Sequence, residues 1–293
     1  MKTNAERAQE RLTLTPKTEF TLKKDGFIGA LYQPEQDEYP GKAVIMFGGS
    51  DGIYNLTKLV AEQYVKRGMT ILALAYWNEP GLPDGFEKVP VDSVEKAVLW
   101  LRGQGFENVG LWGISMGAEL ALLAGSLMPQ LISCVTAVCP TNICGQGFVK
   151  KKSIQALECS AFSWRGEELP WARLKLSRAA ILRDSLRERI VCLRSCYEDA
   201  VRGAPEEAQI KVENIGGPVL LLYPEHDVMW PFGAVGGEDQ GTVEGERLCL
   251  SGTVRQLQIR QSYAGPGEVE LHQNVPGGAE IPGAVLGERF GCL

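Results

Sequence analysis

The sequence predicts an α/β fold: a mostly parallel sheet with helices on both faces and a helical cap insertion. Apolar runs of strand length, such as residues 43–47 and 109–113, alternate with amphipathic stretches of helix length, such as 91–102. Strands that are apolar throughout are buried on both faces, which is typical of a parallel sheet covered by helices on each side. The 293 residues, 44% of them hydrophobic, suffice for one large domain.

The chain begins with a predicted hairpin and then settles into the alternation. Residues 19–23 and 27–32 flank Lys24-Asp25-Gly26, which favours a turn at Asp-Gly. The strand at 43–47 leads to a helix at 56–67, which we expect Gly68 to end. The remaining elements are expected as strands at 69–76, 109–113, 133–138, 218–223 and 257–260, and as helices at 91–102 and 116–128.

Three segments depart from this alternation. We expect residues 1–17 to be an N-terminal extension of one domain, 18–293, and 141–215 to leave the sheet as a cap with a long helical stretch at 173–201. Between Lys150 and Arg202 there are 12 Lys and Arg against 7 Asp and Glu. Such a surface could receive phosphates, but a solvated helix face has the same composition.

The tail, residues 232–293, differs from the rest in composition. It has no lysine and holds 13 of the 34 glycines. We expect a divergent or disordered segment, or one read out of frame from near Phe232.

Composition limits the classes of function. A formal net charge of −6 gives no support to nucleic-acid binding. No run approaches the roughly 20 apolar residues of a membrane span, and the polar N-terminus lacks the apolar core of a secretion signal, so we expect a cytoplasmic protein. Eight cysteines without a Cys-x-x-Cys pair and only two histidines favour buried, reduced thiols, and we expect no metal or redox cofactor.

A candidate nucleophile lies where a predicted strand meets a predicted helix. The sequence Gly113-Ile114-Ser115-Met116-Gly117 matches Gly-x-Ser-x-Gly, the nucleophile elbow of α/β-hydrolases. A tight strand-to-helix turn presents the serine hydroxyl above the sheet, and the helix N-terminus directs its amides at developing negative charge. A structural Gly-Ser-Gly turn is the alternative interpretation.

Two further groups complete the predicted site. Gly49, in the loop after strand 43–47, and Met116 are the candidate oxyanion-hole donors, although a glycine-rich loop also serves a tight turn. Asp227 follows strand 218–223 and fits the acid of a triad, or the cap of a turn. His226, its direct neighbour, is interpreted as structural.

Several motifs together resemble the C-terminal catalytic domain shared by acyl-CoA thioesterases and bile acid-CoA:amino acid N-acyltransferases. They are GFIGALY (26–32), FGGSDG (47–52), AYWNEPGLP (75–83), GLWGISMGAEL (110–120) and HDVMWP (226–231). The hydrolase pattern starts near residue 18, as in the single-domain form found in bacteria. The resemblance implies serine-type acyl transfer on CoA thioesters, with Ser115 as nucleophile and Asp227 as the acid.

The histidine base is the point at which the chain departs from the family. The family places it after the last strand in a Tyr-Pro-Gly-x-Gly-His stretch, whereas here residues 262–267 are followed by Glu268. Glutamate, with a reference pKa near 4.3 against about 6.5 for histidine, is a poor base toward a serine hydroxyl. His272, four positions later, is therefore the candidate base.

The sequence predicts an acyl-CoA thioester hydrolase that acts through an acyl-serine intermediate on a small-molecule acyl-CoA substrate. The alternatives are a catalytically impaired protein that binds acyl ligands, and a carboxylesterase or CoA-dependent N-acyltransferase that uses the same site.

Overall fold

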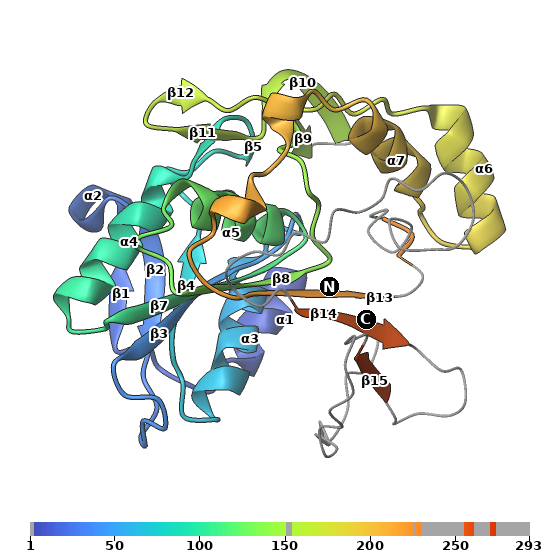
Figure 1. Ribbon diagram of the computed structural model, residues 1–293. Coiled ribbons are helices and arrows are strands. Elements are labelled where there is room, and N and C mark those ends of the chain that lie inside the picture. Colours follow the sequence, from blue (N-terminus) through green and yellow to red (C-terminus); the bar gives the residue numbers. More distant parts are fainter. Residues whose placement is uncertain (1–2, 151–153, 225–226, 230–254, 261–269, 274–293) are drawn as a thin grey trace.

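The computed structural model describes residues 3–150, 154–224, 227–229, 255–260 and 270–273. Its centre is a nine-stranded sheet (Figure 1). The strands are β1 (Thr18–Phe20), β2 (Ile28–Tyr32), β3 (Lys42–Phe47), β4 (Thr70–Ala75), β7 (Asn108–Ile114), β8 (Cys134–Val138), β13 (Val219–Pro224), β14 (Arg255–Arg260) and β15 (Glu270–Gln273). Their order is β1-β2-β4-β3-β7-β8-β13-β14-β15.

Neighbouring strands from β4 to β14 are parallel, and antiparallel pairs lie at the two ends of the sheet, β1-β2-β4 at one and β14-β15 at the other. The predicted first hairpin forms, with Thr18 opposite Leu31. The sequence predicted a turn at Asp-Gly, but the two strands are connected by a short helix whose C-cap is Gly26, with φ of 77°. A positive φ suits glycine, so the Asp-Gly pair ends a helix here.

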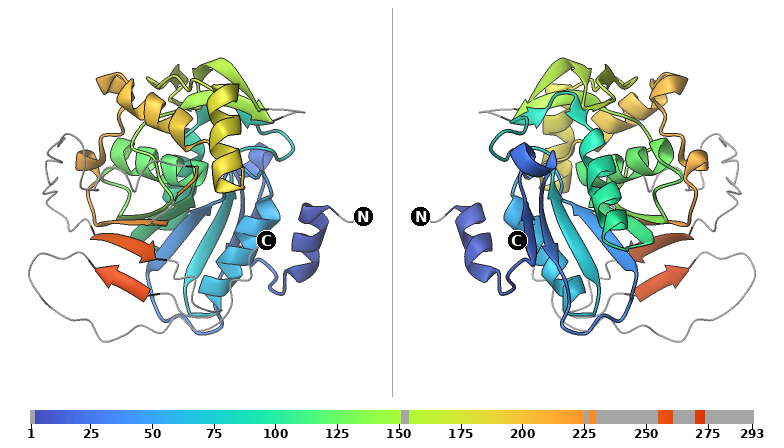
Figure 2. Two further views of the ribbon diagram at one scale, coloured as in Figure 1. Left: turned by 90° about the vertical axis from the view of Figure 1, so that its right-hand side faces the viewer. Right: turned by 90° about the vertical axis from the view of Figure 1, so that its left-hand side faces the viewer.

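Helices cover both faces of the sheet, as predicted. They are α1 (Asn4–Arg11), α2 (Leu22–Asp25), α3 (Tyr54–Val65), α4 (Asp92–Gly103) and α5 (Met116–Leu127). Figure 2 shows α1 and α3 on one side of the sheet and α4 and α5 on the other. Alternate residues of β3 divide accordingly: Ile45 packs in the core with α4 and α5, whereas Met46 packs with Ala61 of α3. This two-sided burial explains why the strands are apolar throughout.

The strand order and the strand–turn–helix at Ser115 are those of the α/β-hydrolase fold, as the sequence predicted. The N-terminal segment is held against the domain. Helix α1 packs on α3, and the backbone amides of Thr13 and Leu14 donate to the buried Glu62 carboxylate, each at 2.9 Å.

The cap mixes strands with helices, so the prediction of a helical cap is correct only in part. Its elements and the two short strands that pair with them are β5 (Gly85–Phe86), β6 (Val89–Pro90), β9 (Gln146–Lys150), β10 (Ile154–Ser160), β11 (Phe162–Trp164), β12 (Glu167–Glu168), α6 (Arg178–Glu188), α7 (Arg194–Arg202), η1 (Glu206–Ala208) and η2 (Val212–Asn214). Strands β9 and β11 pair with β5 and β6, which lie sixty or more residues earlier in the chain. Such pairing leaves no local pattern in the sequence.

The predicted long helix at 173–201 is two helices. Helix α6 ends at Glu188; the next residue, Arg189, has a left-handed φ of 57°, and α7 begins at Arg194. A non-glycine residue in this region is uncommon, and helical periodicity does not reveal it.

Six cysteines lie in the described residues; all are free, and Cys144, Cys159, Cys192 and Cys196 are buried. Among the described residues, no helix has the length and apolar character needed to cross a membrane, and no cluster of three potential metal ligands occurs. Of the tail at 232–293, the described residues are 255–260 and 270–273.

Candidate active site

Ser115 occupies a strained turn between β7 and α5. Its φ of 55° and ψ of −122° lie outside the regions that L-residues ordinarily adopt. The backbone crosses so tightly that a Cβ on Gly113 would lie 2.0 Å from the Gly117 carbonyl oxygen, and one on Gly117 would lie 2.3 Å from that of Gly48. Both glycines of the motif are therefore required by close backbone approach, and the geometry is that of a nucleophile elbow.

The glycine-rich loop after β3 lies against the serine. A Cβ built on Gly49 would be 3.4 Å from the Ser115 Cβ. Two aromatic side chains bind the loop's carbonyl groups: the Tyr76 hydroxyl donates to the Gly48 oxygen at 2.7 Å, and the Trp77 indole donates to the Gly49 oxygen at 3.2 Å. The sequence prediction did not assign a role to either aromatic residue, although both lie in a motif that carries the family resemblance.

Met116 is the first residue of α5, where backbone amides have no partner inside the helix. Met116 directly follows Ser115, and Gly49 lies close to the Ser115 side chain, so both segments that the sequence predicted for the oxyanion hole flank the serine. The dipole of α5 favours negative charge at this end.

Asp227 lies just beyond the end of β13 and is 7% exposed. One carboxylate oxygen accepts the Met229 amide at 2.8 Å. Helix α7 holds the same segment, because the amides of Leu193 and Arg194 donate to the Val228 carbonyl at 3.0 and 3.1 Å. The cap is therefore hydrogen-bonded to the segment that carries the predicted acid.

Cys139 follows β8, which lies between the strands that lead to Ser115 and to Asp227. The Ser115 amide donates to the Val138 carbonyl of β8 at 2.9 Å. The Cys139 amide in turn donates to the Leu222 carbonyl of β13 at 2.7 Å. The Cys139 thiol is hydrogen-bonded to Asp227. Burial, reinforced by the Asp227 charge, raises the pKa of this thiol to about 12, so it is neutral at physiological pH. Ser115 and Asp227 thus follow the carboxyl ends of β7 and β13, with β8 between them, and the Cys139 thiol that follows β8 is bonded to Asp227.

The strand pairing does not bring the backbone of His272 close to the carboxyl ends of β7 and β13, where Ser115 and Asp227 lie. Its backbone lies on β15 opposite Gln258 of β14, which in turn pairs with Tyr223 of β13. Four strand spacings of about 4.8 Å separate β15 from β7, roughly 19 Å along the sheet. His272 as general base stays a prediction. His226 and Glu268 lie outside the described residues.

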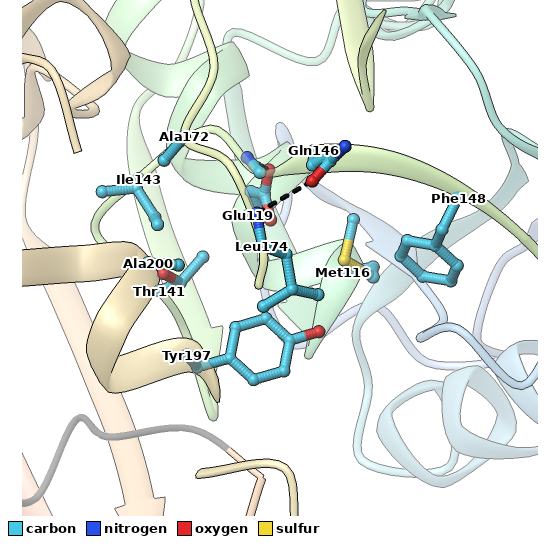
Figure 3. A pocket seen from close by; sticks show the side chains of 11 residues that line it. Met116, Glu119, Thr141, Ile143, Gln146, Phe148, Ala172, Leu174, Tyr197 and Ala200 are labelled. Atoms are coloured by element: carbon cyan, nitrogen blue, oxygen red, sulfur yellow. Dashed lines mark hydrogen bonds between the residues drawn. The ribbon is translucent and has the colours of Figure 1, made fainter. Parts of the chain in front are cut away.

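A pocket opens beside Met116, between α5, the segment after β8, and the cap (Figure 3). Its lining side chains are mostly apolar, with Glu119, Thr141, Gln146 and Tyr197 as the polar exceptions. The Glu119 carboxyl is 1% exposed and accepts the Gly145 amide at 2.8 Å. Burial raises its pKa to about 8. Glu119 lies in the first turn of α5, directly after the elbow. That spacing is the only sequence signal that could have placed it near the site.

The family model described as BAAT / acyl-CoA thioester hydrolase C terminal matches residues 89–241. Human acyl-coenzyme A thioesterase 1 is 28% identical over 203 residues, which cover 67% of this chain and 42% of that protein. Mouse bile acid-CoA:amino acid N-acyltransferase is 33% identical over 117 residues, or 38% of this chain and 26% of that protein.

The chain thus spans less than half the length of these curated relatives. Among solved structures, Est1E from Butyrivibrio proteoclasticus aligns over 84% of this chain and 89% of its own at a TM-score of 0.44, with 12% identity. The family match extends over more than half of the 293 residues. The chain therefore belongs to the BAAT / acyl-CoA thioester hydrolase C-terminal family.

Proposed function

We propose that this chain hydrolyses acyl-CoA thioesters, with Ser115 as the nucleophile. The observation that carries the proposal is the elbow itself: a serine with positive φ at a strand-to-helix turn, beside a glycine loop that aromatic hydrogen bonds hold in place. Membership of a family whose description names acyl-CoA thioester hydrolases supports the substrate class.

In the proposed reaction, the Ser115 oxygen attacks the thioester carbonyl carbon while its proton passes to a general base. The Gly49 and Met116 amides donate to the oxyanion that forms, which is the largest electrostatic contribution in such sites. The CoA thiolate leaves and takes up a proton, giving an acyl-serine ester. Water then attacks this ester and releases the acid.

Asp227 is proposed as the acid that orients the base, since it follows the carboxyl end of β13 as Ser115 follows that of β7, with β8 between the two strands. The chain has two histidines, and the sequence predicts His272 as the base. The position of its backbone on β15 weighs against that role. The proposal therefore assigns the nucleophile, the oxyanion donors and the acid, and leaves the base to be identified with His272→Ala and His226→Ala.

The position of His272 favours a second candidate function, a protein that binds acyl-CoA but turns it over slowly. Triads that lose one member keep about 10³–10⁴-fold acceleration over water from the remaining site. Slow turnover is therefore compatible with an intact elbow and oxyanion hole.

Release of CoA from acyl-CoA substrates, measured by chromatography on wild type and Ser115→Ala, tests the proposal. We expect turnover by the wild type and its loss in the variant. Turnover that persists in Ser115→Ala contradicts the proposal, and the absence of turnover despite tight acyl-CoA binding favours the second candidate.

A further inference from the structure

Helix α6 and the residues after it present large apolar side chains to solvent. Four of them are between 58% and 71% exposed: Leu182, Leu186, Ile190 and Val191. They are the most exposed large hydrophobic side chains of the residues that the structure describes. Single exposed apolar residues are common on protein surfaces, but a group of them at one place marks an interaction site.

The side of α6 that faces the cap is polar. Its buried residue is Asp184, which is 4% exposed, and the Ser185 hydroxyl accepts the Cys192 amide at 2.9 Å. A surface helix ordinarily buries its apolar stripe and exposes its polar face. Helix α6 instead has an aspartate inside and two leucines outside, so packing within the cap does not explain its leucines.

Arginines surround the exposed apolar side chains. Arg183 and Arg187 each directly follow one of the two leucines of α6, so they form a second row beside them. Arg178 begins the helix one turn before the first leucine, and Arg189 directly follows the end of the helix. The exposed charges of residues 178–191 are thus four arginines against one glutamate, in a chain whose net charge is −6.

Two of these arginines have acidic neighbours but keep further donors. The Nε atoms of Arg183 and Arg187 donate to the adjacent carboxylates of Asp184 and Glu188. The arginine side chains are 71% and 73% exposed, and each guanidinium has more N–H groups than this bond uses. They can therefore bind an anion from outside the chain.

Helix α6 lies at the outside of the cap. In Figure 1, α7 lies between α6 and the helices and strands of the domain's core. When the view is turned so that this side faces the reader, α6 is in front (Figure 2, left). A helix in this position can approach a flat surface along its length.

Charge decides which partner suits the surface formed by residues 178–191. A second copy of the chain, related by a two-fold axis, would bring the same arginines together, and like charges across an interface oppose association. An anionic lipid membrane offers phosphate groups to the arginines and an apolar layer to the leucines. The membrane therefore fits both kinds of exposed side chain.

We propose that residues 178–191 dock on an anionic lipid membrane, with α6 in the plane of the interface. Leu182 and Leu186 enter the boundary between headgroups and acyl chains, and the arginines beside them bind headgroup phosphates. The inference does not depend on the proposed function, because Ser115 takes no part in the contact.

Flotation of the full chain with lipid vesicles tests the inference. The vesicles contain phosphatidylcholine alone, or phosphatidylcholine mixed with phosphatidylserine. We expect binding to the mixed vesicles at about 0.1 M salt, and release at about 1 M salt, where the Debye length falls from about 10 Å to about 3 Å. Binding to phosphatidylcholine alone should be at least about tenfold weaker.

The double variant Leu182→Gln, Leu186→Gln tests the apolar part of the contact. We expect its vesicle partition coefficient to fall by roughly tenfold or more, because two leucines no longer leave water on binding. Glutamine is a good helix former, so the variant keeps α6. The matched control is Leu99→Gln, since Leu99 on α4 is 52% exposed and lies outside this surface; it should bind like the wild type.

The double variant Arg178→Gln, Arg187→Gln tests the charged part. We expect a loss of about fivefold for each arginine removed, and a weaker dependence on salt. The matched control is Arg67→Gln, an exposed arginine that directly follows the C-cap of α3 and should leave vesicle binding unchanged.

Absence of binding to the mixed vesicles overturns the inference, as does equal binding to the two kinds of vesicle. Binding that survives both double variants places the membrane contact elsewhere on the chain and also overturns it. A dimer in sedimentation without lipid, which Leu182→Gln with Leu186→Gln converts to a monomer, would make this a self-association surface instead. Ser115→Ala should bind vesicles like the wild type, so failure of the proposed function leaves this inference standing.

Discussion

Glu119→Gln should stabilise the protein, and increasingly so as the pH rises. Wild-type Glu119 is buried in α5, and its pKa of about 8 in the folded chain exceeds the ordinary value of 4.5 because burial disfavours the charge. Below pH 4.5 both states are protonated, so the carboxyl imposes no penalty on folding. Between pH 4.5 and 8 the unfolded chain loses the proton while the folded chain keeps it, so wild-type stability falls through this window.

The magnitude follows from the two pKa values. Each pH unit in the window costs the wild type roughly 1.4 kcal/mol, so the two and a half units between pH 4.5 and 7 amount to about 3 kcal/mol. Above pH 8 the loss levels off near about 5 kcal/mol. Glutamine keeps the oxygen that accepts the Gly145 amide and does not ionise, so the variant escapes this loss. Against a typical total of about 5–15 kcal/mol, the difference is readily measured.

Chemical denaturation of wild type and Glu119→Gln at pH 5, 6, 7 and 8 measures the difference in unfolding free energy. We expect that difference to grow in favour of the variant by roughly 1.4 kcal/mol per pH unit. Glu62→Gln is the control, because the buried Glu62 carboxylate accepts hydrogen bonds from Thr13 and Leu14. Its amide variant loses these charge-assisted bonds and should be less stable than the wild type at pH 7. A difference for Glu119→Gln that is constant with pH, or that shrinks as pH rises, refutes the reasoning.

Three further variants test other parts of the site. Tyr76→Phe removes the hydrogen bond to the Gly48 carbonyl and should lower the free energy of unfolding by about 1–2 kcal/mol. It should also lower kcat more than it raises KM. Unchanged denaturation and kinetics would count against a role for Tyr76 in holding the loop. Gly117→Ala places a Cβ 2.3 Å from the Gly48 oxygen and should destabilise by at least about 1–3 kcal/mol in thermal unfolding, so a wild-type Tm would show the backbone approach to be wrong. His272→Ala should leave the rate of Ser115 labelling by a fluorophosphonate within about twofold, because roughly 19 Å of sheet separates the two backbones; loss of labelling would instead identify His272 as the base.

The sheet and the elbow could be predicted because their causes are local. The strands at 43–47 and 109–113 are marked by contiguous apolar runs, and the Gly-x-Ser-x-Gly motif is contiguous in the sequence, although Gly117 is also crowded by the Gly48 carbonyl of the neighbouring loop. The observed β3 and β7 extend these predictions by at most one residue at each end.

The cap and the pocket could not be predicted in the same way, because their causes are distant in sequence. Strand β9 forms against β5, and the break after α6 is a single left-handed arginine. The pocket brings Glu119, Thr141 and Tyr197 together from α5, the loop after β8, and α7. Cys139 could be placed at the end of a strand from its position after 133–138, but its bond to Asp227 depends on the neighbouring strand.

The central claim is that Ser115 is a working nucleophile, and intact-mass measurement after treatment with a fluorophosphonate tests it most directly. A nucleophilic Ser115 gives one phosphonyl adduct on the wild type, located at Ser115 by peptide mapping, and no adduct on Ser115→Ala. A wild type that stays unlabelled, or an adduct that persists in Ser115→Ala, would contradict it.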